Sequence, residues 1–129
     1  MDKLDELLKN FDLEFFGSGK HKVTVEKALE SFHNNKATIV DVRTKEEVHY
    51  VKFDFAINIP VSDIPERLFE IPKDKAVIVF CSSVVRAAIV YTYLRMKGYV
   101  DVKILTAHLS DIVNCLKPDY VVKTAGGKS

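Results

Sequence analysis

A cysteine and an arginine that follow an apolar run are the residues of this chain best suited to chemistry. Cys81 comes directly after the run 76–80, and Ser82-Ser83-Val84-Val85 lead from it to Arg86, where we expect a helix over 86–97. A thiol at a helix N-terminus meets free backbone N–H groups and the positive end of the helix dipole, and both favour the thiolate. The pattern therefore indicates a nucleophilic cysteine. The alternative is an inert, buried cysteine at the end of a strand.

Arg86 falls in the first turn of that helix, which is an unusual place for a cation. There a positive charge opposes the helix dipole by about 0.3–1 kcal/mol. We therefore expect a negative group nearby, such as a thiolate, a persulfide or a bound oxyanion. The alternative is that Arg86 points into solvent.

The segments around this loop alternate between expected strands and expected helices. Apolar and β-branched runs predict strands at 37–42, 55–59, 76–80 and 102–105, and the spacing of apolar residues predicts helices at 1–10, 25–33, 45–50, 65–70, 86–97 and 107–116. The run at 76–80 has no polar alternation, which is typical of a strand buried on both faces of a parallel sheet. The sequence thus predicts an α/β fold with a parallel sheet of about five strands and helices on both faces.

The carboxyl ends of parallel strands are where such sheets bind ligands. Three segments with polar or reactive side chains fall at these ends: Asp41 to Arg43, Cys81 to Arg86, and Thr106 to His108. We expect His108 to be a surface or half-buried histidine at a helix start, although it could line the site.

The order and spacing of three motifs resemble the single-domain rhodaneses. The motifs are Asp41-Val42-Arg43-x-x-x-Glu47, then Ala56-Ile57-Asn58-Ile59-Pro60, then Cys81-x-x-x-x-Arg86 after its apolar strand. The resemblance extends from about His21 to Leu116. It implies a rhodanese-like fold and a sulfurtransferase whose cysteine accepts sulfane sulfur as a persulfide and passes it to a thiophilic acceptor.

The resemblance also implies roles for individual residues. Cys81 would be the sulfur carrier, and the loop would cradle the sulfur through Ser82, Ser83, Val84, Val85 and Arg86. Arg86 would order this loop and offset negative charge, and Asp41 and Arg43 would be framework residues below the site. The implied donor is thiosulfate or another persulfide donor. No cofactor or metal is implied, and the expected partner is a small sulfur-containing anion or thiol, or a sulfur-accepting protein.

Two alternative functions remain, one because the sequence departs from the usual family motif and one because related enzymes use a similar loop. Val84 stands where the family usually has a glycine, which favours a catalytically weak rhodanese-like module that binds a partner protein. Phosphatases and arsenate reductases of the same fold also use a cysteine–arginine loop. They have five residues between the two, whereas the loop from Cys81 to Arg86 has four, so this alternative ranks below the others.

The composition of the chain argues against some classes of function. The chain has 129 residues with 19 basic and 18 acidic side chains, a balance that predicts neither nucleic-acid nor membrane binding. Its longest apolar run, at 76–81, is too short to cross a bilayer. Cys81 and Cys115 form no C-x-x-C pair, so we expect free thiols in the cytoplasm, with Cys115 in the core.

The sequence is expected to divide into three parts. Residues 1–20 should form an N-terminal helical extension, residues 21–118 the rhodanese-like domain, and residues 119–129 a flexible C-terminal tail.

Overall fold

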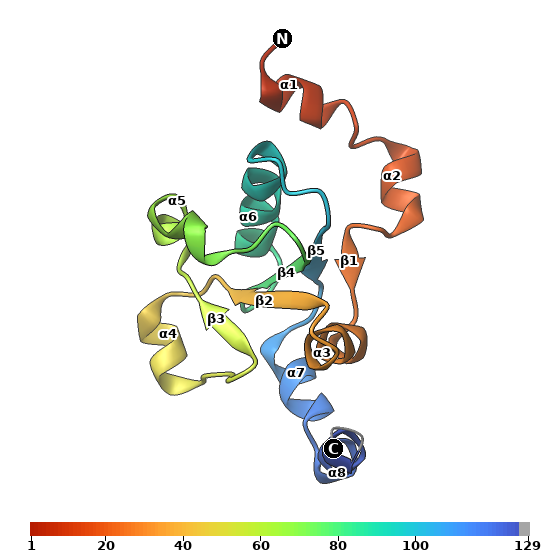
Figure 1. Cartoon of the computed structure of the whole chain (residues 1–129), viewed down its shortest axis with the longest axis vertical. Coiled ribbons are helices and arrows are strands. Elements are labelled where there is room, and N and C mark those ends of the chain that lie inside the picture. The colour runs from red at the N-terminus through yellow and green to blue at the C-terminus, as the bar shows by residue number, and fades with distance from the viewer. Residues whose placement is uncertain (127–129) are drawn as a thin grey trace.

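A five-stranded, fully parallel sheet lies at the centre of the computed structural model, which describes residues 1–126 (Figure 1). Its strands are β1 (Lys22–Val23), β2 (Ala37–Asp41), β3 (Ala56–Asn58), β4 (Ala76–Phe80) and β5 (Val102–Leu105), in the order β1-β5-β4-β2-β3. The apolar run at 76–80 therefore forms the middle strand, with β5 on one side and β2 on the other. The predicted parallel α/β sheet is confirmed.

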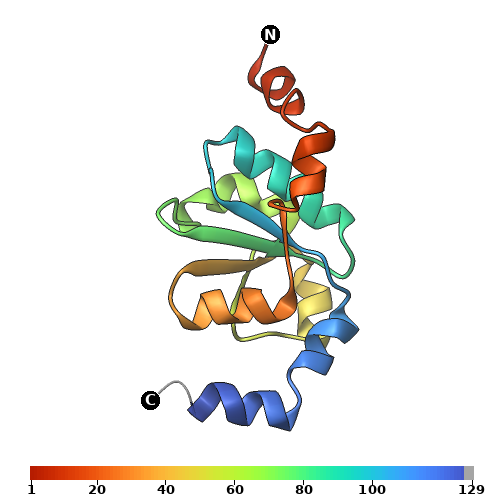
Figure 2. The same cartoon turned by 90° about the vertical axis from the view of Figure 1, so that its right-hand side faces the viewer.

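Helices cover both faces of this sheet, as predicted (Figure 2). They are α1 (Lys3–Leu8), α2 (Leu13–Ser18), α3 (Val25–His33), α4 (Lys45–Tyr50), α5 (Ile64–Arg67), α6 (Val85–Met96), α7 (Leu109–Cys115) and α8 (Pro118–Gly126), with 3-10 turns η1 (Val61–Asp63) and η2 (Leu68–Glu70). Helices α5 and α6 pack on one face, whereas α3 and α7 pack on the other.

Strand β4 shows why its sequence has no polar alternation. Val77 and Val79 belong to the apolar cluster under α6, while Ile78 and Phe80 belong to the cluster under α3 and α7. Successive side chains point to opposite faces of a strand, and here both faces are covered. Cys81 continues the alternation and lies on the α6 side.

The N-terminal part of the chain differs from the prediction in two elements. The expected helix over 1–10 is present as α1, but a second helix, α2, follows it because the Asp12 side chain accepts a hydrogen bond from the Phe15 N–H at 2.9 Å. Strand β1 has only two residues, too few for a periodic pattern, and it is held by parallel pairing with β5. Phe11 and Phe15 pack on the cluster under α6, where the Phe11 ring lies 6.2 Å from that of Tyr91.

The segment from 119 onward contains a helix that the sequence analysis did not predict. Helix α8 begins at Pro118, and the side chain of Tyr120 packs against the cluster under α3 and α7. A proline at the first helical position loses no hydrogen bond, which explains this start. Residues 127–129 of the expected tail lie outside the described residues, and its flexibility stays a prediction. Within residues 1–126 no helix is long and apolar enough to cross a bilayer.

A glycine at the end of α6 allows the chain to turn back towards β5. Gly98 has φ +90°, a conformation that costs other residues about 1–2 kcal/mol. We expect Gly98→Ala to lower the free energy of unfolding in urea by about 1–2 kcal/mol. The matched control is Gly17→Ala inside α2, where φ is not positive and an added Cβ meets nothing within 4 Å. That variant should be neutral or stabilising by about 0.5–1 kcal/mol, and equal losses in the two variants would contradict the argument.

Candidate active site

Cys81 lies at the carboxyl end of the central strand, buried beneath the loop that follows it. Asp41 of β2 pairs with Phe80 of β4, and the Val42 N–H donates to the Phe80 carbonyl at 3.0 Å, so Cys81 emerges beside the end of β2. Its exposed fraction is 0%. Residues 82–84 form bends without regular secondary structure, and α6 begins at Val85.

The start of α6 has free backbone donors close to Cys81 in the chain. The first hydrogen bond of the helix joins the Ala88 N–H to the Val84 carbonyl at 2.9 Å. The N–H groups of Val85, Arg86 and Ala87 therefore have no acceptor within the helix, and among the described residues no side chain caps this end. Such an end stabilises negative charge.

Val84 adopts a conformation that does not require a glycine. Its φ is −138° and its ψ is −28°. Because φ is negative, the β-branched side chain meets none of the steric penalty of the left-handed region. The departure from the family glycine at this position therefore puts no strain into the loop.

Arg86 is paired with a carboxylate from another helix. Its Nη1 donates to Glu47 Oε1 at 2.6 Å and its Nη2 donates to Glu47 Oε2 at 2.9 Å. Nη2 also donates to Ser82 Oγ at 3.0 Å, which ties the loop to the start of α6. The negative group expected near Arg86 is thus present, but it is Glu47, to which the sequence analysis assigned no role.

Glu47 is itself held by the N-terminus of α4. The Thr44 N–H donates to Glu47 Oε1 at 3.1 Å, and the Glu47 N–H donates to Thr44 Oγ1 at 3.3 Å, a reciprocal capping box. One carboxylate therefore caps α4 and binds Arg86. The sequence carried a signal for the first of these roles, since Thr44-x-x-Glu47 has the spacing of a capping box.

The ion pair shifts the protonation equilibria of both partners. The hydrogen bonds from Arg86 lower the pKa of Glu47 from 4.5 to about 2, aided by the donors of Thr44. The bond to Glu47 outweighs burial and raises the pKa of Arg86, and negative charge on Cys81 adds to this rise. Arg86 thus stays cationic beside Cys81.

Asp41 and Arg43 form a buried ion pair at the carboxyl end of β2, and their framework role stays a prediction. Arg43 Nη2 lies 2.6 Å from Asp41 Oδ2, and the two side chains are 1% and 3% exposed. Arg43 also donates to the Val51 carbonyl at 2.8 Å just after α4. Asn58 Nδ2 donates to the carbonyls of Asp41 and Arg43, both at 2.9 Å, and its role was not predicted.

The other two candidates of the sequence analysis lie at the two ends of α7. His108 is exposed at the start of α7, where its N–H donates to Asp111 Oδ2 at 2.9 Å. Cys115 is half-buried against the cluster under α3 and α7. Burial, and then the charges of Glu26 and Asp119, raise the pKa of its thiol, so Cys115 is a poor nucleophile.

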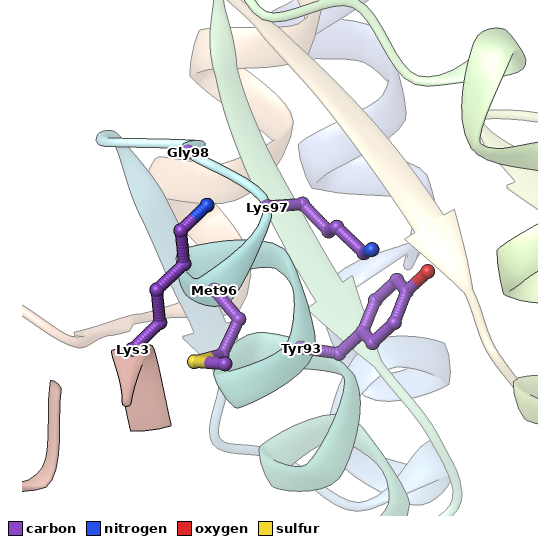
Figure 3. Close-up of a pocket in the computed structure, with 5 residues that line it drawn as sticks. All are labelled: Lys3, Tyr93, Met96, Lys97 and Gly98. Atoms are coloured by element: carbon purple, nitrogen blue, oxygen red, sulfur yellow. The ribbon is translucent and has the colours of Figure 1, made fainter. Parts of the chain in front are cut away.

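A cavity of about 550 Å³ lies at the other end of α6. Lys3, Tyr93, Met96, Lys97 and Gly98 line it (Figure 3). From Val85 to Met96 the helix rises about 16 Å, so this cavity is remote from Cys81. It is no part of the candidate site.

Comparison with known proteins places this arrangement in a family. The family model "Rhodanese-like domain" matches residues 24–115. The chain belongs to the rhodanese-like domain family. The match includes both halves of the Glu47–Arg86 pair and the loop between Cys81 and Arg86.

Relatives of this rhodanese-like domain include proteins named as sulfurtransferases. A sulfurtransferase of Allochromatium vinosum is 38% identical over 61 residues, which are 47% of this chain and 57% of that protein. The yeast single-domain sulfurtransferase RDL2 has a solved structure with a TM-score of 0.60 and 27% identity, covering 71% of this chain and 87% of that one. The solved structure of human single-domain sulfurtransferase TSTD1 shares the fold, with a TM-score of 0.67 and 21% identity. The match covers 77% of this chain and 100% of that one.

The buried pair gives a stability test of the rhodanese framework. Removing one partner leaves the other charge buried and unpaired, so we expect Asp41→Ala to lower the free energy of unfolding by about 3–5 kcal/mol. Asp41→Asn, which keeps an acceptor, should lose less and serves where the alanine variant does not fold. The control is Asp101→Ala in the exposed pair with Lys103, with an expected loss of about 0–1 kcal/mol. Equal losses at positions 41 and 101 in urea titrations would contradict the framework role.

The Glu47–Arg86 pair gives a pH test. Glu47 binds a proton near pH 4.5 in the unfolded chain but only near pH 2 in the folded protein. As the pH falls, the unfolded state gains protons first and the stability due to the pair is lost. The excess unfolding free energy of the native protein over Glu47→Gln should be constant above about pH 5.5 and shrink towards about pH 3. Glu46→Gln controls for the loss of one carboxylate from α4, and a pH-independent excess would refute the pairing.

Proposed function

We propose that this protein is a sulfurtransferase that carries sulfane sulfur as a persulfide on Cys81. The observation that carries the proposal is the place of Cys81, at the end of the central strand and just before a helix N-terminus with three free N–H groups. These groups, together with Arg86, favour a negatively charged sulfur. Membership of the rhodanese-like family and the sulfurtransferase relatives support the same activity.

The proposed reaction has two balanced halves. The Cys81 thiolate attacks the outer sulfur of a donor R–S–SH, the S–S bond of the donor breaks, and R–S⁻ leaves and takes up the proton. In the second half an acceptor thiolate attacks the outer sulfur of the Cys81 persulfide, whose S–S bond breaks to return the Cys81 thiolate. No external oxidant or reductant is consumed. In this proposal the loop Ser82–Arg86 holds the charge on the outer sulfur.

The loop must move during each half reaction. Cys81 has an exposed fraction of 0%, so no donor reaches its sulfur in this conformation. Ser82 and Ser83 lie outside the strand and the helix, and the loop is held by the 3.0 Å hydrogen bond from Arg86 Nη2 to Ser82 Oγ, whereas β4 and α6 on either side are regular. We therefore propose that this short segment swings away from the sulfur while β4 and α6 stay in place.

The same burial favours a second candidate, a rhodanese-like module that binds a partner protein without catalysis. In that case the covered Cys81 would be a core residue, and only the surface of the fold would be used. The two candidates differ in one property: whether Cys81 accepts sulfur.

The proposal also concerns the cellular compartment and the need for a cofactor. Cys81 and Cys115 are both free thiols, which fits the reducing cytoplasm. No cofactor enters the proposed chemistry.

Mass spectrometry of the intact protein tests the proposal. After treatment with a small organic persulfide we expect one added sulfur, mapped by peptide analysis to Cys81 and absent from Cys81→Ser. Cys115→Ser should load as well as the native protein, because burial raises the pKa of Cys115 and its removal leaves the site intact. Sulfur on Cys115 alone, or no added sulfur, would move the assignment to the binding module.

A further inference from the structure

The guanidinium charge at the end of the loop is balanced within the protein itself. Arg86 is the only cation in the segment from Cys81 to Arg86, and it makes a two-point bond to the carboxylate of Glu47. Ser82 Oγ accepts a further hydrogen bond from the same guanidinium. A small inorganic dianion at this loop would therefore meet a cation that is already paired with a carboxylate.

The start of α6 exposes apolar side chains beside the loop. Val85 in the first turn of α6 is 70% exposed, and Ile89 one turn later is 55% exposed. Residues four apart share one face of a helix, so the two side chains form an adjacent pair. Val84, at 37% exposure, continues this apolar surface into the loop. We call Val84, Val85 and Ile89 the apolar rim.

We propose that the sulfur donor is the persulfide of a protein cysteine in an apolar segment, which docks against the apolar rim, and that thiosulfate is a poor donor. The inference rests on the proposed function, because it concerns the donor for the same Cys81. It follows from the paired charge of Arg86 together with the exposed aliphatic side chains next to the nucleophile. An apolar segment gains by covering Val85 and Ile89, whereas a dianion gains nothing from them.

The step balances as the transfer of one neutral sulfur atom. The Cys81 thiolate attacks the outer sulfur of the partner's Cys–S–SH, the S–S bond of the partner breaks, and the partner cysteine leaves as a thiolate that takes up the proton. Cys81 then holds the persulfide, and the partner returns to a free thiol. No charge has to be bound beyond that of the thiolate itself.

Two peptides and thiosulfate serve as donors in the test. One synthetic peptide carries a cysteine persulfide between leucine and valine residues, and the other carries it between aspartate residues. The rate at which Cys81 gains sulfur is followed by mass spectrometry in the Cys115→Ser background. We expect the apolar peptide to load Cys81 at least about tenfold faster than the acidic peptide or thiosulfate.

Substitutions in the rim separate docking from chemistry. Ile89→Asp should slow loading by the apolar peptide about tenfold and leave loading by a small organic persulfide unchanged. The matched control is Val100→Asp, since Val100 is 85% exposed just before β5, at the opposite edge of the sheet from Cys81. That variant should load like the native protein with every donor.

A cation added to the rim should reverse the preference. Val85→Lys removes apolar surface and places an unpaired charge beside the loop, so loading by thiosulfate should rise while loading by the apolar peptide falls.

Two further side chains that can carry positive charge follow the strands on either side of β4. They are Lys45 after β2 and His108 after β5, and steering of thiosulfate by them would appear as a loading rate that drops with salt.

The outcomes distinguish this inference from the proposed function. If thiosulfate loads Cys81 as fast as the apolar peptide, or if Ile89→Asp and Val100→Asp behave alike, the protein donor is refuted and the sulfurtransferase stands. If no donor, the small persulfide included, places sulfur on Cys81, the proposed function itself fails.

Discussion

The buried ion pair between Asp41 and Arg43 is the interaction on which the rest of the site depends. Two charges with almost no exposure are stable only as partners, so the end of β2 is held in one geometry. Arg43 extends this constraint to the chain after α4 through the Val51 carbonyl. Its guanidinium also lies 6.0 Å from the ring centre of Phe80, the residue before Cys81. The cost of leaving either charge unpaired thus maintains the relation between β2, α4 and the end of β4.

Helix α4 transmits that order to the loop after Cys81. With its ends defined by Thr44 and Val51, α4 presents Glu47 at a position where it meets Arg86 of α6. Arg86 in turn holds Ser82, which follows Cys81. A continuous set of hydrogen bonds therefore runs from the framework below the sheet edge to the loop around Cys81. Each link in this set is a direct contact. The ion pairs Asp41–Arg43 and Glu47–Arg86 each carry no net charge.

This neutrality has a consequence for the chemistry that the site can support. A cation engaged by a carboxylate stabilises charge that develops on a neighbouring sulfur, but it offers less attraction to a diffusing anion than a free cation does. The exposed side chains at the start of α6 include Val85 and Ile89, so a partner that contacts them gains from apolar burial. This arrangement agrees with the proposed persulfide on Cys81 and with the proposed preference for an apolar donor.

The sequence alone was sufficient for the sheet, the central position of 76–80, most helices and the family. These features depend on local periodicity, capping residues and short motifs, which are read along the chain. It did not reveal strand β1, because two residues have no period and their pairing with β5 is made across the fold. It also did not reveal helices α2 and α8. For the site, the sequence predicted roles for Cys81, Arg86, Asp41 and Arg43. Only the tertiary structure decided that Glu47, 39 positions before Arg86, is the partner of that cation. It also decided that Val84 keeps a negative φ and that Cys81 is fully covered. The reason is physical: a local pattern sets which elements form, whereas the charge balance and the burial of a side chain depend on which elements pack together.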